Sequence, residues 1–407
     1  MPDAPRVCHL VTRLIVGGAQ RIALETAAHF RELGWRVELW SGPEAGPEGS
    51  LREEARRRGL PLREVPDLVR DVAPRRDWAA LCWLRRAFRA QPFDLVHTHS
   101  AKAGILGRLA AAHARVPYRI HTVHGWSMDR DEPRIVRALY AAAERIAARR
   151  CQKLIAVSEA VREMGLRHRI GTPAQYEVIH GGIALPTPPG EDERRRAREA
   201  LGLPQEAIVV GTIGRLDEAK DPLGVLATLA PLLADEPRLW VAFIGDGPLR
   251  DEVARARAQL PAPDRVRLCG LLPDAAQRLA AFDLFVLASR REGFPLVVLE
   301  AMAAGLPVVT YDVAGVREAV CDEVTGFVVA PGDAAGWQDR LASLIASREA
   351  RERMGATGRQ RVAEHFTREG MLARTLALYG RLNPAWATAS GPLPAPAAVE
   401  AESQTAS

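Results

Sequence analysis

The sequence has few cysteines, and none of them are spaced as a pair. The five cysteines lie far apart in the 407-residue chain, and no Cys-x-x-Cys occurs among Cys8, Cys82, Cys151, Cys269 and Cys321. Disulfide frameworks and thiolate zinc sites use paired cysteines. We therefore expect neither kind of site, and the pattern is typical of a reducing compartment.

Long apolar runs are also missing. The chain begins Met1-Pro2-Asp3-Ala4-Pro5-Arg6, without the apolar stretch of a signal peptide. No uncharged apolar run approaches the roughly 18 residues that a membrane-spanning helix needs. We predict a cytoplasmic protein that does not cross a membrane but can lie against the inner face of the plasma membrane.

The Gly-x-Gly-x-x-Gly fingerprint of dinucleotide-binding proteins is absent as well. Gly17 and Gly18 follow a predicted strand and open a predicted helix that continues to about Leu33, but this helix has no third glycine. A dehydrogenase is therefore disfavoured.

Charge is distributed unevenly along a chain of otherwise ordinary composition, with 47% hydrophobic and 26% charged residues. Residues 1–180 carry a net charge of +10 and the remainder −5. The basic half indicates an anionic contact, such as a membrane leaflet, a lipid pyrophosphate or nucleic acid. Arginines that only solvate helix faces explain the same charge, and this alternative stays open.

Short apolar runs alternate with helix-length segments, and a Pro-rich stretch separates two such series. The predicted strands are 7–11, 36–40, 94–97, 118–123 and 153–157, then 208–213, 239–244, 265–268, 284–287 and 308–310. This alternation is typical of an α/β protein with parallel sheets. We predict two tandem Rossmann-like, doubly wound domains that face a cleft.

The same pattern predicts the domain boundaries. A first domain covers residues 1–182, and a linker covers 183–206. The second domain covers 207–366, and a helix at 367–382 packs back towards the first domain. Residues 383–407 lack periodicity and are predicted to be a disordered tail.

Residues 289–307 predict a short helix with a phosphate-binding start. Pro295 suits the first helical position, Gly305 suits the left-handed position after the last turn, and Pro307 stops the helix. The free N–H groups and the positive dipole end of the first turn suit a phosphate.

Four charged residues add to this site. Glu300 lies inside the predicted helix, where a carboxylate can accept two hydrogen bonds from a ribose, and Glu292 precedes the helix within reach of a sugar. Arg215 and Lys220 lie just beyond the predicted strand 208–213, where two cations can neutralise a diphosphate leaving group without a metal ion. Each residue alone is an ordinary surface residue, but together they predict a nucleotide-diphosphate site.

Several motifs occur in a specific order. The second half contains GRLDEAKD (214–221), IGDGP (244–248) and EGFPLVVLEAMA (292–303), and the first half contains GGAQR (17–21), HTHSAKAGILGR (97–108) and HTVHGW (121–126). Over about residues 6–380 the chain resembles glycosyltransferase family 4, and in particular its polysaccharide-assembly members. The resemblance implies the GT-B fold, with the first domain on the acceptor side and the second binding a nucleotide-sugar.

The resemblance also implies roles for individual residues. Arg215 and Lys220 match the diphosphate-binding pair, Glu300 the ribose-binding glutamate, and Glu292 the glutamate beside the donor sugar. The remaining positions contact the donor through the main chain or line the cleft: His124 near the transferred sugar, Gly18 at the phosphate, Leu271 and Leu272 at the base, and Gly293, Phe294 and Leu296 at the sugar or phosphate.

Two departures from the family pattern are visible. The crossing between the domains reads His180-Gly181-Gly182-Ile183-Ala184 where Pro-Asn-Gly-Val/Ile-Asp is common, and Arg317 stands where a proline is common. The first change concerns hinge geometry more than catalysis.

The function implied is a retaining, metal-independent hexosyl transfer from a nucleotide-diphosphate sugar to a glycan or lipid-pyrophosphate-linked acceptor in polysaccharide biosynthesis. No cofactor and no nucleic-acid partner are expected. A nucleotide-sugar 2-epimerase on the same scaffold is disfavoured, because such proteins usually show Thr-Glu-Arg-Pro-Glu where this chain has Arg291-Glu292-Gly293-Phe294-Pro295. A binding-only member is disfavoured because every charged donor-site position is filled.

Two groups of residues resemble metal sites. His97 and His99 are expected on opposite faces of their strand, so we predict no metal site among His97, His99, His121 and His124. Asp129-Arg130-Asp131 has the Asp-x-Asp form of a different glycosyltransferase fold, but it precedes a predicted helix and is expected to cap it.

The basic helix around Trp83-Leu84-Arg85-Arg86-Ala87-Phe88-Arg89 suits lipid headgroups as a peripheral contact with an anionic membrane. Arginines on a solvated helix face are an equal alternative. The donor base, the sugar, the acceptor, the linkage and the oligomeric state do not follow from the sequence.

Overall fold

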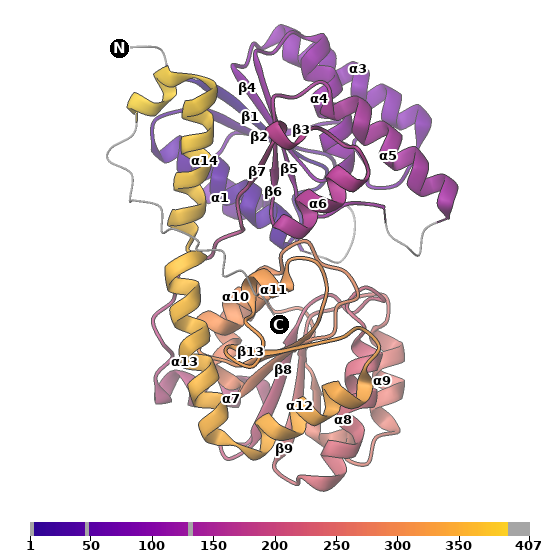
Figure 1. Cartoon of the computed structure of the whole chain (residues 1–407), viewed down its shortest axis with the longest axis vertical. Helices are drawn as coiled ribbons and strands as arrows, with labels where there is room; N and C mark the ends of the chain where they lie inside the picture. The colour runs from indigo at the N-terminus through magenta and orange to yellow at the C-terminus, as the bar shows by residue number, and fades with distance from the viewer. Residues whose placement is uncertain (1–3, 45–48, 129–132, 390–407) are drawn as a thin grey trace, which may run out of the picture.

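Two parallel β-sheets, each covered by helices on both faces, form two stacked lobes (Figure 1). The structure is a computed structural model, and it describes residues 4–44, 49–128 and 133–389. The seven strands of the first sheet are β1 (Arg6–Val11), β2 (Arg36–Ser41), β3 (Leu62–Glu64), β4 (Leu95–His99), β5 (Tyr118–Val123), β6 (Lys153–Ala156) and β7 (Tyr176–Val178). The six strands of the second are β8 (Ile208–Ile213), β9 (Leu239–Ile244), β10 (Val266–Leu268), β11 (Leu284–Leu287), β12 (Val308–Tyr311) and β13 (Gly326–Val329).

Helices connect successive strands, as parallel pairing requires. Those of the first lobe are α1 (Gly18–Glu32), α2 (Arg52–Arg57), α3 (Pro74–Ala90), α4 (Ala101–His113), α5 (Arg134–Ala148), α6 (Glu159–Arg167) and the short η1 (Pro173–Gln175). The remainder are α7 (Glu191–Leu201), α8 (Pro222–Asp235), α9 (Arg250–Ala258), η2 (Pro263–Arg265), η3 (Ala275–Ala281), α10 (Leu296–Ala303), α11 (Val316–Ala319), α12 (Ala334–Ala346), α13 (Arg348–His365), α14 (Arg368–Leu382) and η4 (Pro384–Ala389).

The order of strands confirms the predicted fold class. The first sheet runs β3-β2-β1-β4-β5-β6-β7 and the second β10-β9-β8-β11-β12-β13, with every pair of named strands parallel. Both orders reverse direction beside their first strand, which is the doubly wound pattern. The sequence did not predict β3, β7 or β13, which have only three or four residues each and lie at the edges of the sheets.

The predicted linker contains a helix. Residues 191–201 form α7, which buries Ala197 and Leu201, and the Arg198 guanidinium lies 2.8 Å from the Asp283 carboxylate. The charged run resembled a linker because hydropathy counts arginine only as a charge. In the structure the aliphatic stems and guanidinium groups of these arginines cover the second lobe. The left-handed Gly202 (φ +65) ends this helix.

The C-terminal helices join the lobes. In Figure 1, α13 runs along the second lobe and α14 continues along the first. The Tyr379 ring of α14 stacks on Phe30 of α1 with ring centroids 4.8 Å apart, and its hydroxyl lies 2.5 Å from Nδ1 of His97. The first sheet is therefore packed against a helix that follows the second sheet in sequence.

The predicted tail begins too early. Residues 384–389 form η4, and the buried Trp386 side chain contacts the Trp35 and Tyr118 rings, with centroids 5.8 and 4.9 Å away. A tryptophan that buries its ring on the first lobe fixes this segment, despite its low periodicity. Residues 390–407 of the predicted tail lie outside the described residues, as do Asp129 and Asp131.

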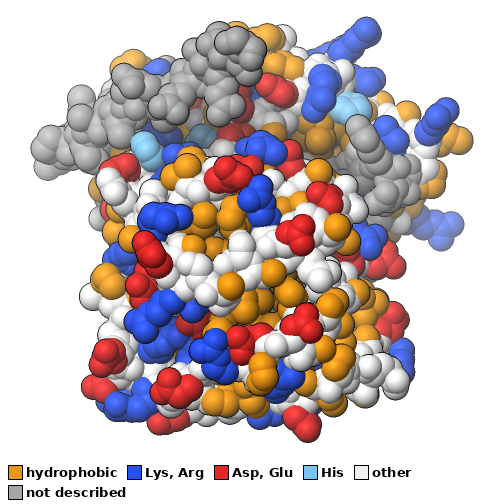
Figure 2. All heavy atoms as spheres, turned by 60° about the horizontal axis from the view of Figure 1, so that its bottom comes forward, with side chains coloured by type: hydrophobic (Ala, Val, Ile, Leu, Met, Phe, Trp, Pro, Cys, Tyr) orange, Lys and Arg blue, Asp and Glu red, His pale blue; other side chains and the backbone are white. Residues whose placement is uncertain are grey.

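The surface charge of the second lobe is mixed. Figure 2 shows acidic and basic side chains interspersed over the face turned towards the viewer, without a field of one sign.

Candidate active site

The site forms where the two sheets reverse strand order. Gly18 follows β1 and Ser100 follows β4 in the first lobe, while Arg215 follows β8 and Glu292 follows β11 in the second. Ligands of doubly wound folds bind at such switch points, outside the carboxyl ends of the strands. The two lobes contact each other beside the switch point of the second sheet, because the Ser158 hydroxyl, which follows β6, donates a 2.8 Å hydrogen bond to the Gly293 carbonyl oxygen.

The predicted cation pair lines one hollow. Arg215 and Lys220 border a pocket at the end of β8, together with Gly214. The Lys220 ammonium forms an ion pair with the Glu292 carboxylate, and Nε of Arg215 lies 3.4 Å from the Asp217 carboxylate. Both cations are partly exposed, so an anionic ligand can reach them. The structure thus brings together three of the four charged residues that the sequence predicted.

The helix after β11 has the geometry that the sequence predicted for its end. α10 spans Leu296–Ala303, so Pro295 is the N-cap residue and not, as predicted, the first helical residue. Gly305 adopts φ +80 directly after the C-cap residue. Gly293, Phe294 and Leu296 are buried at the interface. The N–H groups of the first turn of α10 have no partner within the helix and point out from its start.

Gly293 is a point of close approach between the lobes. A Cβ at this position would lie 1.9 Å from the His124 carbonyl oxygen, so only glycine fits. His124 and the loop before α10 are therefore in direct backbone contact.

The carboxyl of Glu300 has an unusual environment. It lies on α10, facing Arg21 of α1, which binds Glu54 at 2.7 Å. Burial raises the pKa of the Glu300 carboxyl to about 7, and the nearby Arg21 guanidinium opposes part of this shift. Glu300 is therefore close to half-protonated near neutral pH when no ligand is bound.

Gly18 and the Leu271–Leu272 segment lie on the two sides of the interface. A Cβ at Gly18 would lie 3.5 Å from Cδ1 of Leu296, so the start of α1 faces the start of α10. Leu271 is 46% exposed, and its side chain extends to the first lobe near Gly49. These residues lie at the interface but outside the hollow that contains Arg215 and Lys220.

His124 lines a second hollow, in the first lobe, together with Trp126 and Tyr140. Its Nε2 atom lies 3.1 Å from Nδ1 of His99. Burial lowers the pKa of His124 to about 4, so this imidazole is neutral at physiological pH.

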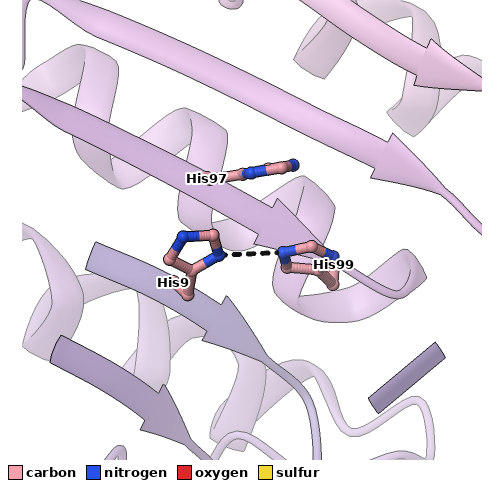
Figure 3. A group of neighbouring side chains, drawn as sticks. All are labelled: His9, His97 and His99. Carbon is pink, nitrogen blue, oxygen red and sulfur yellow. Dashed lines mark hydrogen bonds between the residues drawn. The ribbon is translucent and has the colours of Figure 1, made fainter. Parts of the chain in front are cut away.

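The geometry predicted for the strand histidines is wrong. His97 and His99 lie on the same face of β4 with ring centroids 4.3 Å apart, because residues two apart on a strand point to one side. His9 of β1 joins them, and Figure 3 shows the three rings converging. One nitrogen of each ring lies within 4.8 Å of the others, which is a spacing that can hold a metal ion after contraction.

Existing hydrogen bonds compete with such a metal. Nδ1 of His97 lies 2.5 Å from the Tyr379 hydroxyl, and Nε2 lies 2.7 Å from the Thr122 hydroxyl. Both nitrogens of this ring are thereby engaged, so His97 would have to break one of these bonds to ligate a metal.

The crossing between the lobes is built around its glycines. A Cβ at Gly182 would lie 2.2 Å from the Thr367 carbonyl oxygen, and Ile183 pairs with Thr367 as a parallel bridge. His180 contacts Glu318 at 2.7 Å, and Glu318 also accepts hydrogen bonds from the backbone N–H groups that start α6. These contacts hold the crossing without the proline and asparagine common elsewhere.

Comparison with known proteins agrees with this geometry. The family model described as Glycosyltransferase Family 4 matches residues 16–185, and the one described as Glycosyl transferases group 1 matches residues 193–361. The D-inositol 3-phosphate glycosyltransferase of Mycolicibacterium paratuberculosis is 31% identical, over 81% of this chain and 77% of its own length. The chain belongs to glycosyltransferase family 4. It is a transferase with the GT-B fold.

Two further proteins are similar to this glycosyltransferase. The Escherichia coli enzyme named UDP-Gal:alpha-D-GlcNAc-diphosphoundecaprenol alpha-1,3-galactosyltransferase is 29% identical, over 81% of this chain and 84% of its own length. Among solved structures, Anabaena HepE in complex with UDP and glucose superposes with a TM-score of 0.80 at 20% identity, covering 92% of this chain and 99% of its own. At that identity the second likeness concerns the fold alone.

Sequence reasoning missed several residues of this glycosyltransferase. Arg21 lies in the GGAQR motif but was given no role, although its charge acts on Glu300 across the interface; His9 contacts His99 through strand pairing, and Glu318 binds the start of α6. For His9 a signal existed, because a histidine in the first strand and another in the fourth pair in register as His9 and His97. Among the described residues, no helix is long and apolar enough to cross a membrane.

Proposed function

We propose that this glycosyltransferase transfers a hexose from a nucleotide-diphosphate sugar to a lipid-pyrophosphate-linked glycan, with retention of anomeric configuration. One observation carries the proposal: Arg215 and Lys220 line one hollow at the end of β8, and Lys220 pairs with Glu292 beside the start of α10. Two cations and a helix start are the groups that hold a diphosphate as charge develops on it.

Each predicted site residue has a role in this proposal. Arg215 and Lys220 bind the diphosphate, Glu300 binds the ribose, and Glu292 and His124 face the transferred sugar. Backbone groups of Gly293, Phe294 and Leu296 contact the sugar and phosphate, Gly18 admits the phosphate to the start of α1, and Leu271 and Leu272 border the base. A departing phosphate oxygen accepts the acceptor proton, and the cations stabilise its charge without a metal ion or cofactor.

The names of relatives support the choice of substrates to test. The Escherichia coli relative is named for UDP-galactose and a diphosphoundecaprenol acceptor, and Anabaena HepE was solved with UDP and glucose. Purified protein is incubated with a panel of UDP-hexoses and a synthetic polyprenyl-pyrophosphate monosaccharide, and NMR of the product reports its anomeric configuration. An α-linked product from an α-linked donor supports the proposal, whereas an inverted product refutes retention.

The same assay without acceptor separates the alternatives. Formation of an epimeric nucleotide-sugar identifies a 2-epimerase. In the assay with acceptor, tight nucleotide binding without any turnover identifies a binding-only member.

We also propose that the first lobe contacts an anionic leaflet through α5. Ile135, Leu139 and Ile146 are 76%, 66% and 52% exposed and fall on one face of this helix, since they are separated by four and seven positions. Exposed Arg134 and Arg149 flank this stripe. An apolar stripe between cations is typical of interfacial helices.

Helix α3, which the sequence suggested for this contact, exposes one large apolar side chain, Trp78, where α5 exposes three. Its Trp83 ring packs against Trp40, with centroids 5.7 Å apart, and is therefore turned inward. Sedimentation with phosphatidylglycerol vesicles tests the choice of helix. Ile135→Ser/Leu139→Ser should release the protein from these vesicles, while Arg85→Gln/Arg86→Gln on α3 should leave most of it bound; the reverse result assigns the contact to α3.

A further inference from the structure

Three imidazoles form a continuous hydrogen-bonded chain from the core of the first sheet to the site. Nδ1 of His9 lies 3.2 Å from Nε2 of His99, and Nδ1 of His99 lies 3.1 Å from Nε2 of His124. Figure 3 shows the first of these contacts, between the rings on β1 and β4. We call His9, His99 and His124 the histidine chain.

All three rings are neutral at physiological pH. Burial lowers the pKa of His9 to about 3 and that of His124 to about 4, and burial together with neighbouring histidines lowers the pKa of His99 well below its usual value. A neutral imidazole has one N–H donor and one acceptor nitrogen. His99 must therefore donate at one end and accept at the other, which couples the tautomers of all three residues.

Two proton arrangements satisfy the histidine chain. In the first, His9 donates from Nδ1 to His99, His99 donates from Nδ1 to His124, and His124 has its proton on Nδ1. In the second, every bond is reversed: His124 donates from Nε2, its Nδ1 offers a lone pair, and His9 has its proton on Nε2.

The buried end of the histidine chain distinguishes them. Within the described part of the chain, Nε2 of His9 is buried and has no hydrogen-bond partner. The second arrangement would place an N–H there, and buried N–H groups without an acceptor are rarer in proteins than under-satisfied acceptors. The first arrangement leaves only a lone pair at this nitrogen and is favoured.

We propose that His9 and His99 are positioning residues that hold His124 as its Nδ1–H tautomer, a hydrogen-bond donor towards the transferred sugar. The proposal rests on the function proposed above for the residues around His124. It excludes a role of His124 as a general base, since a base would need the Nδ1 lone pair. A hydrogen-bond donor that is already oriented before the substrate binds needs no reorganisation during the reaction.

A metal ion among His9, His97 and His99 is the competing explanation of the cluster. It would require nitrogens that already bind one another or bind Thr122 and Tyr379. The histidine chain needs no such change and leaves one nitrogen, Nε2 of His9, without a partner among the described residues.

Nitrogen-15 NMR of the full-length protein, labelled at histidine, tests the proposal without any substrate. Single histidine variants assign the imidazole signals. The proposal expects a protonated Nδ1 and an unprotonated Nε2 at His124, at neutral pH and after treatment with a chelator. A protonated Nε2 at His124 would overturn it, and so would shifts of His9, His97 and His99 on addition of one equivalent of zinc that a chelator reverses.

Two variants separate positioning from mere packing. His99→Phe removes the middle of the histidine chain, whereas His97→Phe removes an equally buried ring beside it. Both should lower the midpoint of thermal unfolding, but only His99→Phe should give a mixture of His124 tautomers. His99→Phe should also lower kcat/KM for the nucleotide-sugar about tenfold, because the loss of one neutral hydrogen bond has an effect of this size.

The outcomes distinguish the two proposals. An unchanged His124 tautomer in His99→Phe refutes the positioning role, whatever the activity. A wild-type protein with the expected tautomer but no sugar transfer refutes the proposed function and leaves the tautomer assignment standing.

Discussion

Donor binding should depend on pH through Glu300. Burial raises the pKa of its carboxyl to about 7, while a ribose is bound best by the carboxylate, which accepts both hydrogen bonds. A group with this pKa is about 9% ionised at pH 6 and about 91% ionised at pH 8. If only the carboxylate binds, affinity for the donor should rise roughly tenfold between these values, or about 1.4 kcal/mol.

Isothermal titration calorimetry with a UDP-hexose measures this effect directly. A nucleotide-diphosphate sugar has no ionisation of its own near neutral pH, so the dependence reports the protein. At pH 6, binding should release close to one proton, which is seen by comparing buffers of different ionisation enthalpy. Glu300→Gln should bind more weakly at pH 8 and show a flat profile, and Arg21→Gln should move the inflection to higher pH, because the Arg21 charge lowers the pKa of Glu300. The same pH dependence in Glu300→Gln and in the wild type would refute the assignment.

Three further predictions concern stability. Gly293→Ala should lower the free energy of unfolding in urea by about 1–3 kcal/mol, since its Cβ would overlap the His124 carbonyl oxygen. Gly190→Ala, which has open space around it but lies at the N-cap of α7, should cost at most about 0.5 kcal/mol. Trp386→Ala should cost about 3–5 kcal/mol if the buried ring fixes the C-terminal segment, and a loss below about 1 kcal/mol would contradict that packing. Because burial lowers the pKa of His9 to about 3, the unfolded state takes up its proton first as pH falls below the usual histidine value; His9 should therefore cost about 2 kcal/mol of stability at pH 5 relative to pH 7, and His9→Phe should remove that part of the acid sensitivity.

The fold followed from the sequence where local signals were strong. Buried parallel strands such as 208–213 and 239–244 are nearly uninterrupted apolar runs, and proline and glycine mark the limits of α10. Edge strands of three or four residues have weak signals because they are short. The signal of α7 is weak because its arginine stems bury surface that hydropathy does not register. The predicted tail also begins too early, because residues 384–389 form η4 around the buried Trp386 ring, which hydropathy patterns do not show.

The site was predictable to the extent that it is local in sequence. Arg215, Lys220 and Glu292 belong to motifs; the structure places the two cations around one hollow and pairs Lys220 with Glu292. The environment of Glu300 depends on Arg21, nearly three hundred residues away in sequence, so its raised pKa could not be predicted from either motif. The prediction for the histidines was wrong because it placed residues two apart on a strand on opposite faces. His9 joins the cluster through the pairing of β1 with β4.

The central claim is that Arg215 and Lys220 hold the donor diphosphate as it leaves. The most direct test compares rates of sugar transfer in the wild type and in Arg215→Gln/Lys220→Gln, at saturating donor. Arg238→Gln/Arg348→Gln serves as control, because it removes two exposed arginines far more accessible to solvent. The account predicts at least about a 10³-fold loss of rate in the first variant, as expected when groups that stabilise developing charge are removed, and less than a twofold change in the control. A first variant that transfers sugar within threefold of the wild-type rate would contradict the account.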